Sequence, residues 1–326
     1  METSTSSCAI EILPGDDRLT AFPICRKGVY GFVEDSIKSY WTPGEISFAR
    51  DTEDWYKLNP QMQHCIKSVV AFFAASDAIV NVNITGRFRE DIPILEVRYF
   101  YDHQVAMENI HAITYSLSLD SIVPEAAERT RLLNSIKTIP IIGKMTEYMF
   151  KCISSEESFA KRILRMACVE GIFFTGCFCI IYWLQSKGLM PGLGQANELI
   201  ARDEGLHTTF ALFLYDMIRT ESKLSTEEVY TIFEDAVSIA CEFVSYTLPG
   251  GMPEMNATLM TEYVKYCADN LITMIGHPPL YKAVNDFHFM DQINMANRTN
   301  FFERRVSEYS KASRGDSVRG EVCRDF

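Results

Sequence analysis

Long segments with apolar residues at helical spacing and no internal proline make up most of this 326-residue chain. Apolar side chains at positions i, i+3, i+4 and i+7 share one helix face, whereas a half-buried strand alternates apolar and polar residues. Alternating runs bounded by turn residues are hard to find in this sequence. The chain is therefore predicted to be all-α.

Six long helices are predicted from the apolar spacing and from residues typical of helix ends. They run from Asn59 to Phe88, from Asp91 to Pro124, from Ser154 to Gly188, from Pro191 to about Arg219, from Ser225 to Pro249 and from Asn256 to Gly276. Weaker helical patterns cover Pro140 to Cys152 and the region near Trp41.

Capping signals support two of these helix starts. Asp91 and Pro93 match a capping residue followed by a first-turn proline. The run Ser154-Ser155-Glu156-Glu157 matches a capping box, and Gly188 after Lys187 is typical of a helix end. Both starts are testable expectations.

One domain is expected, because no linker-like composition interrupts residues 40–300. We assign residues 1–30 to an N-terminal extension and residues 31–300 to the helical domain. Residues 301–326 are polar with little periodicity, which predicts a flexible C-terminal tail.

The net charge of −12 and the lack of a Lys/Arg block argue against a nucleic-acid or anionic membrane partner. The N-terminus has no signal-peptide pattern, and no uncharged apolar run reaches the ~18 residues of a membrane span. The ten cysteines include no C-x-x-C pair, so neither a zinc site nor a redox motif is indicated. A cytoplasmic protein is expected.

Two of the six histidines follow a glutamate by three residues, each within a predicted helix. The pairs are Glu108 with His111 and Glu204 with His207. Residues three apart share one helix face, so each pair directs a carboxylate and an imidazole to one place. A single pair would be weak evidence, because chance places a glutamate at this offset at about its background frequency.

Two further acids stand alone in apolar helical stretches, Asp77 in AFFAASDAIV and Glu170 in CVEGIFFTGCF. A buried carboxylate needs a cation, a proton or several donors. One acid from each of two helices, with Glu-x-x-His from each of two others, resembles the di-metal carboxylate site of ferritin-like bundles. Oxygen-rich ligands with two imidazoles suit iron or manganese better than zinc or copper. A ferritin-like bundle with such a site is therefore predicted.

Five motifs closely resemble, in order, those of the small, radical-generating subunit of class I ribonucleotide reductase. They are AFFAASDAIVNVNI, AMENIHAITYSL, VEGIFFTGCF, GLMPGLGQANELIARDEGLH and TNFFERRVSEY, and the resemblance covers Trp41 to Tyr309. It implies two iron ions, oxo-bridged when oxidised, on Asp77, Glu108, His111, Glu170, Glu204 and His207. With dioxygen these would generate a stable radical on Tyr115, and a homodimer is expected.

The resemblance also implies a partner, the large catalytic subunit, which reduces ribonucleoside diphosphates to deoxyribonucleotides with the radical equivalent it receives. The matching relay residues are Trp41, Asp203 and the ligand His111, followed by Tyr309. The chain alone would not turn over nucleotides. In the family the tail docks on the large subunit, and Asp325 and Phe326 fit that role.

Tyr115 also has a rationale in helix geometry. It follows His111 by four residues, which places its ring on the same side about 5.4 Å along the axis. Phe173 and Phe174, three and four residues after Glu170, are expected to form a dry wall around the radical.

Two features depart from the family pattern. Arg319 and Arg324 make the tail more basic than that of many eukaryotic relatives, so the partner groove is expected to differ. Val82 stands where relatives often have glutamate, near the site in sequence.

Other functions share parts of this pattern. A di-iron oxygenase, desaturase or oxidase would use the same ligands, but Tyr115, Trp41 and the tail argue against it. An iron-storage protein would need neither the tail nor Trp41. A radical-incompetent partner subunit would not need the complete ligand set. Manganese or a mixed manganese–iron pair is compatible with the ligands, although Tyr115 favours the di-iron, tyrosyl-radical type.

Overall fold

The computed structural model describes residues 18–290 except Ser155 and Pro253, and all regular elements in these residues are helices. In chain order they are α1 (Lys27–Lys38), η2 (Pro43–Glu45), α2 (Ala49–Trp55), α3 (Pro60–Asn83), η3 (Ile84–Phe88), α4 (Arg89–Asp91), α5 (Leu95–Ile122), α6 (Ala126–Leu133), α7 (Ser135–Thr138), α8 (Pro140–Phe150), η4 (Lys151–Ile153), α9 (Phe159–Cys168), η5 (Val169–Phe174), α10 (Thr175–Ser186), α11 (Pro191–Asp216), η6 (Thr220–Ser222), α12 (Thr226–Thr247), α13 (Ala257–Met274) and η7 (His288–Met290). The all-α prediction is confirmed.

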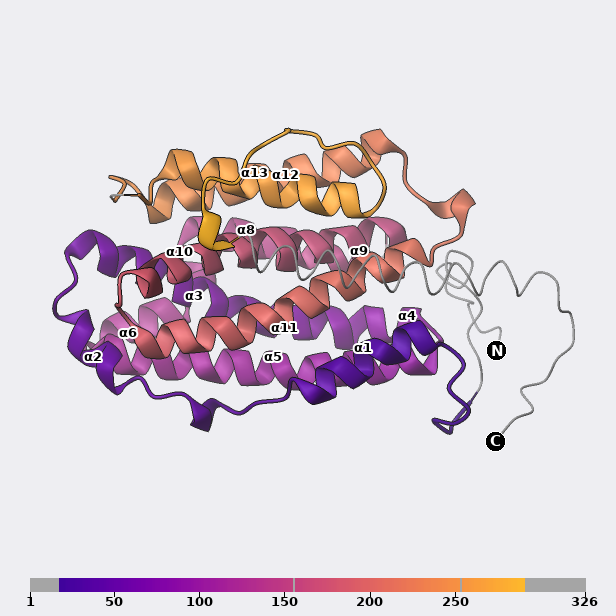
Figure 1. The fold of residues 1–326 in the computed structure, drawn as a ribbon, viewed down its shortest axis with the longest axis horizontal. Coiled ribbons are helices and arrows are strands. Elements are labelled where there is room, and N and C mark those ends of the chain that lie inside the picture. The colour runs from indigo at the N-terminus through magenta and orange to yellow at the C-terminus, as the bar shows by residue number, and fades with distance from the viewer. Residues whose placement is uncertain (1–17, 155, 253, 291–326) are drawn as a thin grey trace, which may run out of the picture.

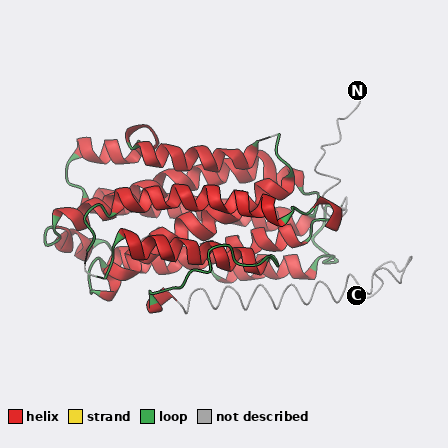
Figure 2. Ribbon diagram, turned by 90° about the horizontal axis from the view of Figure 1, so that it is seen from above, coloured by secondary structure: helices red, strands yellow, loops and turns green. Residues whose placement is uncertain are grey.

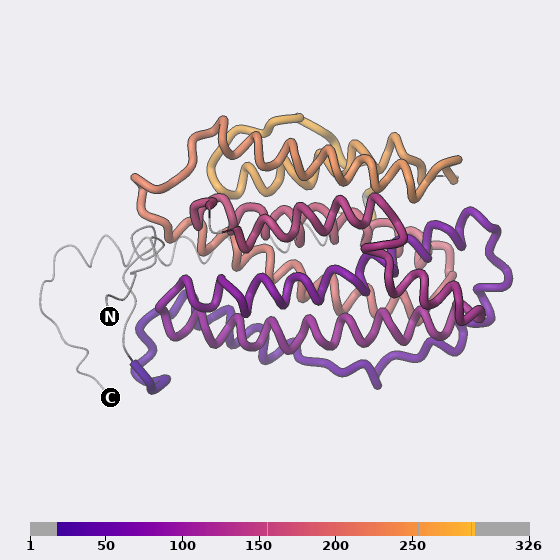
Figure 3. Tube along the Cα trace, turned by 180° about the vertical axis from the view of Figure 1, so that it is seen from behind, coloured from indigo at the N-terminus to yellow at the C-terminus, as the bar shows by residue number. Residues whose placement is uncertain are grey.

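The long helices lie roughly along one common axis, as the view from above shows (Figure 2). In Figure 1, α12 and α13 form the upper layer, α8, α9 and α10 lie beneath them, and α5 and α11 lie lower still. α3 packs against α5 along its length, which is clearest from behind (Figure 3). One apolar core runs through these layers.

Two helices continue through π-helical segments. α3 passes through η3 into α4, and α9 passes through η5 into α10. These continuous stretches, Pro60–Asp91 and Phe159–Ser186, are long and apolar enough to cross a membrane. Within their most apolar windows, however, 72% and 89% of residues are buried in the structure, as expected of core helices.

All six predicted long helices are present, and four of their starts match the predicted residues: α11 begins at Pro191, and three further starts are set by capping side chains. Asn59 and Asn256 cap α3 and α13 through their side chains, and Ser225 forms a capping box with Glu228 at α12. A side-chain oxygen at this position satisfies an amide that has no partner within the helix. These boundaries were therefore readable from local sequence.

Two predicted starts were wrong. α5 begins at Leu95, because Pro93 holds Ile92 in an extended conformation and so separates the two helices. Asp91 instead ends α4, where its carboxylate pairs with Arg162 at 2.7 Å. At α9 the cap is Ser158, which accepts a hydrogen bond from the Lys161 amide.

The capping run before α9 failed for a related reason. The chain offers several serines and glutamates in succession, and Glu157 is drawn to Arg165, with two hydrogen bonds of 2.8 Å. Glu157 is thus engaged by Arg165 of α9, and Ser158 is the residue that caps this helix.

Some predicted features lie outside the described residues. These are Tyr309, Arg319, Arg324, Asp325, Phe326 and the rest of the predicted tail, as well as residues 1–17 of the extension. The start of α1 at Lys27 places the predicted boundary after residue 30 inside a helix. The short helices α6 and α7 were not predicted.

Candidate metal centre

The six predicted ligands lie within the bundle, on four long stretches of helix. Asp77 lies on α3, Glu108 and His111 on α5, Glu170 on η5, and Glu204 and His207 on α11. None of the six is more than 3% exposed. Helical spacing thus brings together residues that are up to 130 positions apart in sequence, since Asp77 and His207 mark the extremes.

The ligand atoms form two overlapping clusters in which all atoms lie within 4.8 Å of one another. One cluster contains Glu108, Glu170, Glu204 and His207, and the other contains Asp77, Glu108 and His111. Glu108 belongs to both clusters. Two cations could therefore share its carboxylate.

The two imidazoles face the carboxylates of Glu108 and Glu204. His111 Nδ1 lies 3.0 Å from Glu204 Oε1 and 3.4 Å from Glu108 Oε2. His207 Nδ1 lies 3.1 Å from Glu108 Oε1 and 3.3 Å from Glu204 Oε2. Glu108 and Glu204 each therefore lie close to both imidazole rings.

The donor set fits two divalent metal ions. One carboxylate oxygen of Asp77 and one of Glu170 are buried without a hydrogen-bond partner. Leaving a buried polar atom unpaired costs about 1–3 kcal/mol, and more for a charged one. Coordination to cations would satisfy these atoms and offset the repulsion among the acids.

Protonation in the absence of metal reflects the same geometry. Burial raises the pKa of Asp77 and Glu170 well above normal, and neighbouring carboxylates add to the effect. Burial also opposes ionisation of Glu108, but hydrogen bonds from His111 and His207 outweigh it and hold its pKa at about 2. The pKa of each histidine is raised, because its carboxylate partners outweigh burial. Positive charge is thus favoured where metal ions would bind.

Gln104 is a site residue that the sequence analysis missed. Its Nε2 donates to Glu108 Oε1 at 3.2 Å and to Glu170 Oε1 at 2.9 Å, and the side chain is buried. One amide therefore orients ligands from two helices. Its position one turn before Glu108 was the available signal.

The π-helical segment η5 contains Glu170. A π-bulge shifts the helix face by one residue and is frequent at functional sites. Next to Glu170, Gly171 packs so closely that an added Cβ would lie 2.7 Å from Leu271 Cδ1 and 2.9 Å from Thr208 Cγ2. The lack of a side chain there lets η5 approach α11 and α13.

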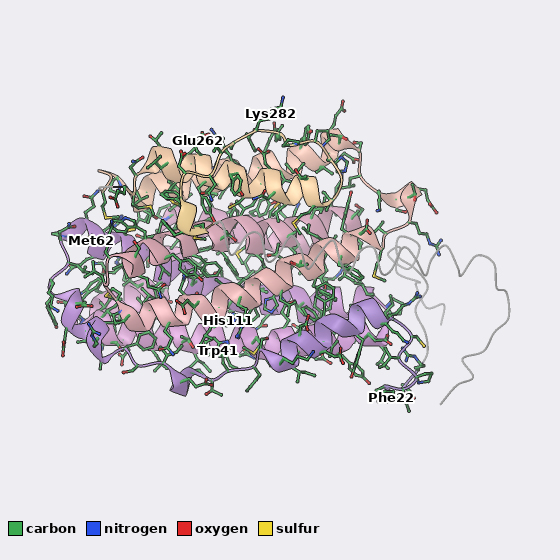
Figure 4. The ribbon with its side chains drawn as sticks, viewed as in Figure 1. Phe22, Trp41, Met62, His111, Glu262 and Lys282 are labelled. Carbon is green, nitrogen blue, oxygen red and sulfur yellow. The ribbon has the colours of Figure 1, made fainter. Side chains whose placement is uncertain are left out.

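Trp41, Asp203 and His111 form a connected chain of contacts. Trp41 Nε1 donates to Asp203 Oδ2 at 2.7 Å, and the same oxygen lies 3.3 Å from His111 Nε2. The Trp41 and His111 rings also stack, with centroids 5.9 Å apart, and Figure 4 shows the two residues side by side. Burial opposes ionisation of Asp203, but the bonds from His111 and Trp41 lower its pKa.

Tyr115 is fully buried, and its hydroxyl has no hydrogen-bond partner. Burial, followed by the charges of Asp77 and Glu204, raises the pKa of its phenol well above normal. The aromatic ring against it is Phe73, stacked at 4.5 Å with an interplanar angle of 5°. Phe73 was not predicted as part of this pocket.

Phe173 and Phe174, which were predicted to surround Tyr115, make their ring contacts with other aromatic residues. Phe174 packs edge-on against Phe73 at 5.5 Å, and Phe173 contacts Tyr148 at 5.4 Å. Val82, by contrast, is 47% exposed.

A family model described as "Ribonucleotide reductase, small chain" matches residues 18–286 of this sequence. The chain belongs to the ribonucleotide reductase small-chain family. Its buried carboxylate and histidine cluster is the di-metal site of a small chain, and the earlier family assignment is confirmed.

Curated small chains of ribonucleoside-diphosphate reductase are similar to this chain over most of their length. The protein from Nicotiana tabacum is 45% identical over 93% of this chain and 92% of its own. The protein from Trypanosoma brucei brucei is 46% identical over 91% and 88%, and that from Vaccinia virus is 42% identical over 92% and 93%.

Solved small-chain structures share the fold. The Rnr4 homodimer from Saccharomyces cerevisiae aligns with a TM-score of 0.78 and 30% identity, covering 91% of each chain. A dimanganese(II)-NrdF structure from Streptococcus sanguinis aligns with a TM-score of 0.71 over 87% of this chain and 99% of its own. At 16% identity, the latter supports the fold alone.

Proposed function

We propose that this chain generates and stores the radical of a ribonucleoside-diphosphate reductase, with Tyr115 as the carrier. The observation that carries the proposal is the position of an unpaired, buried phenol beside a complete di-metal ligand set. On α5, Tyr115 follows the ligand His111 by four residues, which places it about one helical turn away.

Two iron ions are the proposed cofactor, held by the four acids and two histidines named above. When bound, iron and dioxygen supply the one-electron oxidant that the protein side chains lack. Oxygen-rich ligands with two imidazoles are equally compatible with manganese, and availability decides between such metals. Metal analysis of protein from its native source tests the choice, and manganese found there at two ions per chain would contradict di-iron.

Tyr115 is suited to hold a radical because of its surroundings. Its raised pKa keeps the phenol neutral until oxidation removes an electron and a proton. The stacked Phe73 ring and the second ring layer of Phe174 exclude water, which would otherwise allow the radical to be quenched.

The chain from Trp41 through Asp203 to His111 is the proposed route for the radical equivalent. Asp203 Oδ2 contacts both rings, so it can hold the Trp41 N–H proton while it orients His111. Tyr309 is proposed to continue the route to the large catalytic subunit. Asp325 and Phe326 are proposed to anchor the tail on that subunit, with Arg319 and Arg324 adapting it to a particular groove.

We also propose a homodimer formed through α5, in the cytoplasm. Ile113 and Leu117 are 52% and 45% exposed on this helix, and they line a shallow depression with Ala112, Ser116 and Asp120. A two-fold axis would bring the same apolar patch of two copies together. The related yeast Rnr4 structure is described as a homodimer.

The function is tested by assaying ribonucleoside-diphosphate reduction with iron-loaded chain, alone and with the large subunit from the same source. We expect turnover only with both subunits. Trp41→Phe should abolish turnover but keep the Tyr115 radical, because the radical site is intact and the route is cut. The control is Trp183→Phe, a buried indole whose N–H has no hydrogen-bond partner. Full turnover by Trp41→Phe, or none by the wild-type pair, would contradict the proposal.

A further inference from the structure

The segment that carries Trp41, residues 39–54, lies antiparallel along α11. At one end Arg202 Nη2 donates to the Ser39 carbonyl at 2.5 Å, and midway Gln195 Nε2 donates to the Glu45 carbonyl at 3.4 Å. Increasing residue number in this segment thus corresponds to decreasing number in α11. The other end of the segment reaches the first turn of α11.

Asp51 joins the segment to that first turn. Its side chain is fully buried, with Oδ1 accepting from the Gly192 amide and Oδ2 from the Leu193 amide, both at 2.7 Å. The first amides of a helix have no partner within the helix. Met190, at the N-cap position, makes no side-chain cap, so Asp51 supplies the cap from a separate element.

Two further contacts hold residues 39–54 against the first turn of α11. Asp54 Oδ2 accepts from the Met190 amide at 3.2 Å. A Cβ at Gly192 would collide with the Ser47 carbonyl oxygen and lie 3.1 Å from Asp51 Oδ2. The backbones therefore approach more closely than any other residue at position 192 would allow.

We propose that Asp51, with Gly192, is the positioning residue that holds Trp41 in hydrogen-bond contact with Asp203. Asp203 lies ten residues beyond Leu193 on α11, about 15 Å along the helix. Trp41 itself lies in a connection without regular structure, so its place depends on what fixes both ends of the segment. The contacts of Asp51 with the first turn of α11 therefore fix how residues 39–54 are aligned along the rest of that helix.

The inference rests on the proposed function for its catalytic consequence but not for its structural one. The test therefore begins with metal-free, full-length protein containing ¹⁵N-labelled tryptophan. The indole signal of Trp41, identified by its loss in Trp41→Phe, reports its N–H bond to Asp203. We expect Asp51→Ala to move or broaden this signal and leave that of Trp183, on α10, in place.

The matched control is Asp269→Ala. Asp269 is also a buried carboxylate that accepts two backbone amides, from Tyr281 at 2.9 Å and Ala283 at 3.0 Å, but it lies on α13. We expect it to lower stability without moving the Trp41 signal. An unmoved signal in Asp51→Ala, or an equal movement in Asp269→Ala, would overturn the proposal.

A second variant keeps the test valid if Asp51→Ala does not fold. Gly192→Ala should displace the segment and move the same signal, whereas Gly44→Ala, with open space around its Cβ, should not. An unmoved signal in Gly192→Ala contradicts the proposal as well.

The catalytic consequence is measured afterwards on iron-loaded protein with the large subunit. Asp51→Ala should keep wild-type iron content and tyrosyl radical yet lose turnover, by up to about 100-fold for a misplacement near 1 Å. Normal turnover despite a moved indole signal would overturn the role in radical transfer. Failure of the wild type to form a radical would count against the proposed function alone, since the indole measurement needs no metal.

Discussion

Gln104 shows how a single neutral side chain organises two buried acids. Its amide is shared between Glu108 on α5 and Glu170 on η5, so it fixes carboxylate orientations that the metal ions would otherwise have to impose. Loss of a group that orients metal ligands typically lowers metal affinity or activity by about 10–100-fold.

Replacing Gln104 with leucine should weaken metal binding by about 10–100-fold, because Glu108 and Glu170 lose their shared donor. Equilibrium titration of metal-free protein with ferrous iron under anaerobic conditions measures the change. Gln63→Leu is the control, since Gln63 donates to the Trp55 carbonyl instead. Unchanged affinity in Gln104→Leu would show that the hydrogen bonds do not orient the ligands.

Phe73 is the residue that most directly shields Tyr115. Phe73→Leu should leave iron content intact but shorten the lifetime of the tyrosyl radical, because the stacked ring no longer excludes water and small reductants. The decay of the radical signal with time gives the result. Phe233→Leu, which truncates a buried phenylalanine on α12, controls for general core loss. Equal lifetimes in the two variants would contradict the shielding role.

The metal site depends on elements as well as residues, and η5 is the clearest case. Its π-helical turn carries Glu170, and Gly171 lets it pack against α11 and α13. Periodicity predicted one continuous helix here, and the sequence contains no signal for the extra residue in the turn.

Gly171→Ala should lower the melting temperature of the metal-free protein and weaken metal binding, because the new methyl overpacks the core by about 1–3 kcal/mol. Gly176→Ala is a matched change on the next helix, where the nearest atom, Val264 Cγ2, is at an ordinary 3.5 Å. Thermal unfolding of both variants measures the difference. Equal melting temperatures would contradict the close packing of η5.

The start of α5 supports a pH prediction. Glu96 is buried, and although burial opposes its ionisation, Arg18 and the amides of Cys25 and Arg26 lower its pKa below the usual 4.5. A lowered folded-state pKa stabilises the protein above the unfolded value, and this stability is lost as pH falls through the folded one.

Glu96→Gln should therefore be less stable than wild type at neutral pH, with a smaller loss of stability below pH 4.5. Urea unfolding at several pH values measures this slope, and exposed Glu147→Gln is the control. A variant whose acid slope equals that of wild type would contradict the assignment.

What the sequence could predict followed from spacing. The six proposed ligands were found because i, i+3 pairs and lone acids in apolar helices are local patterns. The bond between Trp41 and Asp203 spans 162 residues, and only the family resemblance pointed to it. Gln104 and Phe73 were missed because neither residue type is unusual in a helix.

Helix boundaries were harder to predict than helices. The helix starts after Asn59, Ser225 and Asn256 are set by capping side chains close in sequence. Asp91 and Glu157, which were predicted to cap helices, instead form ion pairs with Arg162 and Arg165. A sequence read in short windows cannot see such partners. The short helices α6 and α7 lack enough turns for a clear period.

At the scale of the whole molecule, the exposed face of α5 should set the oligomeric state. If the proposed dimer forms through this face, Ile113→Asp should yield a monomer, because two carboxylates would face each other across the two-fold axis. Val284→Asp, at a 68% exposed residue that follows α13 in sequence, is the control. Light scattering after size exclusion measures the mass. A dimeric Ile113→Asp protein would place the interface elsewhere.

Radical generation on Tyr115 is tested most directly by an electron paramagnetic resonance spectrum recorded after metal-free protein receives ferrous iron and dioxygen. We expect a tyrosyl signal in the wild type and its absence in Tyr115→Phe, with about the same iron bound by both proteins. A tyrosyl signal that persists in Tyr115→Phe would show that another tyrosine carries the radical. Iron bound by the wild type without any tyrosyl signal would contradict radical generation by this chain.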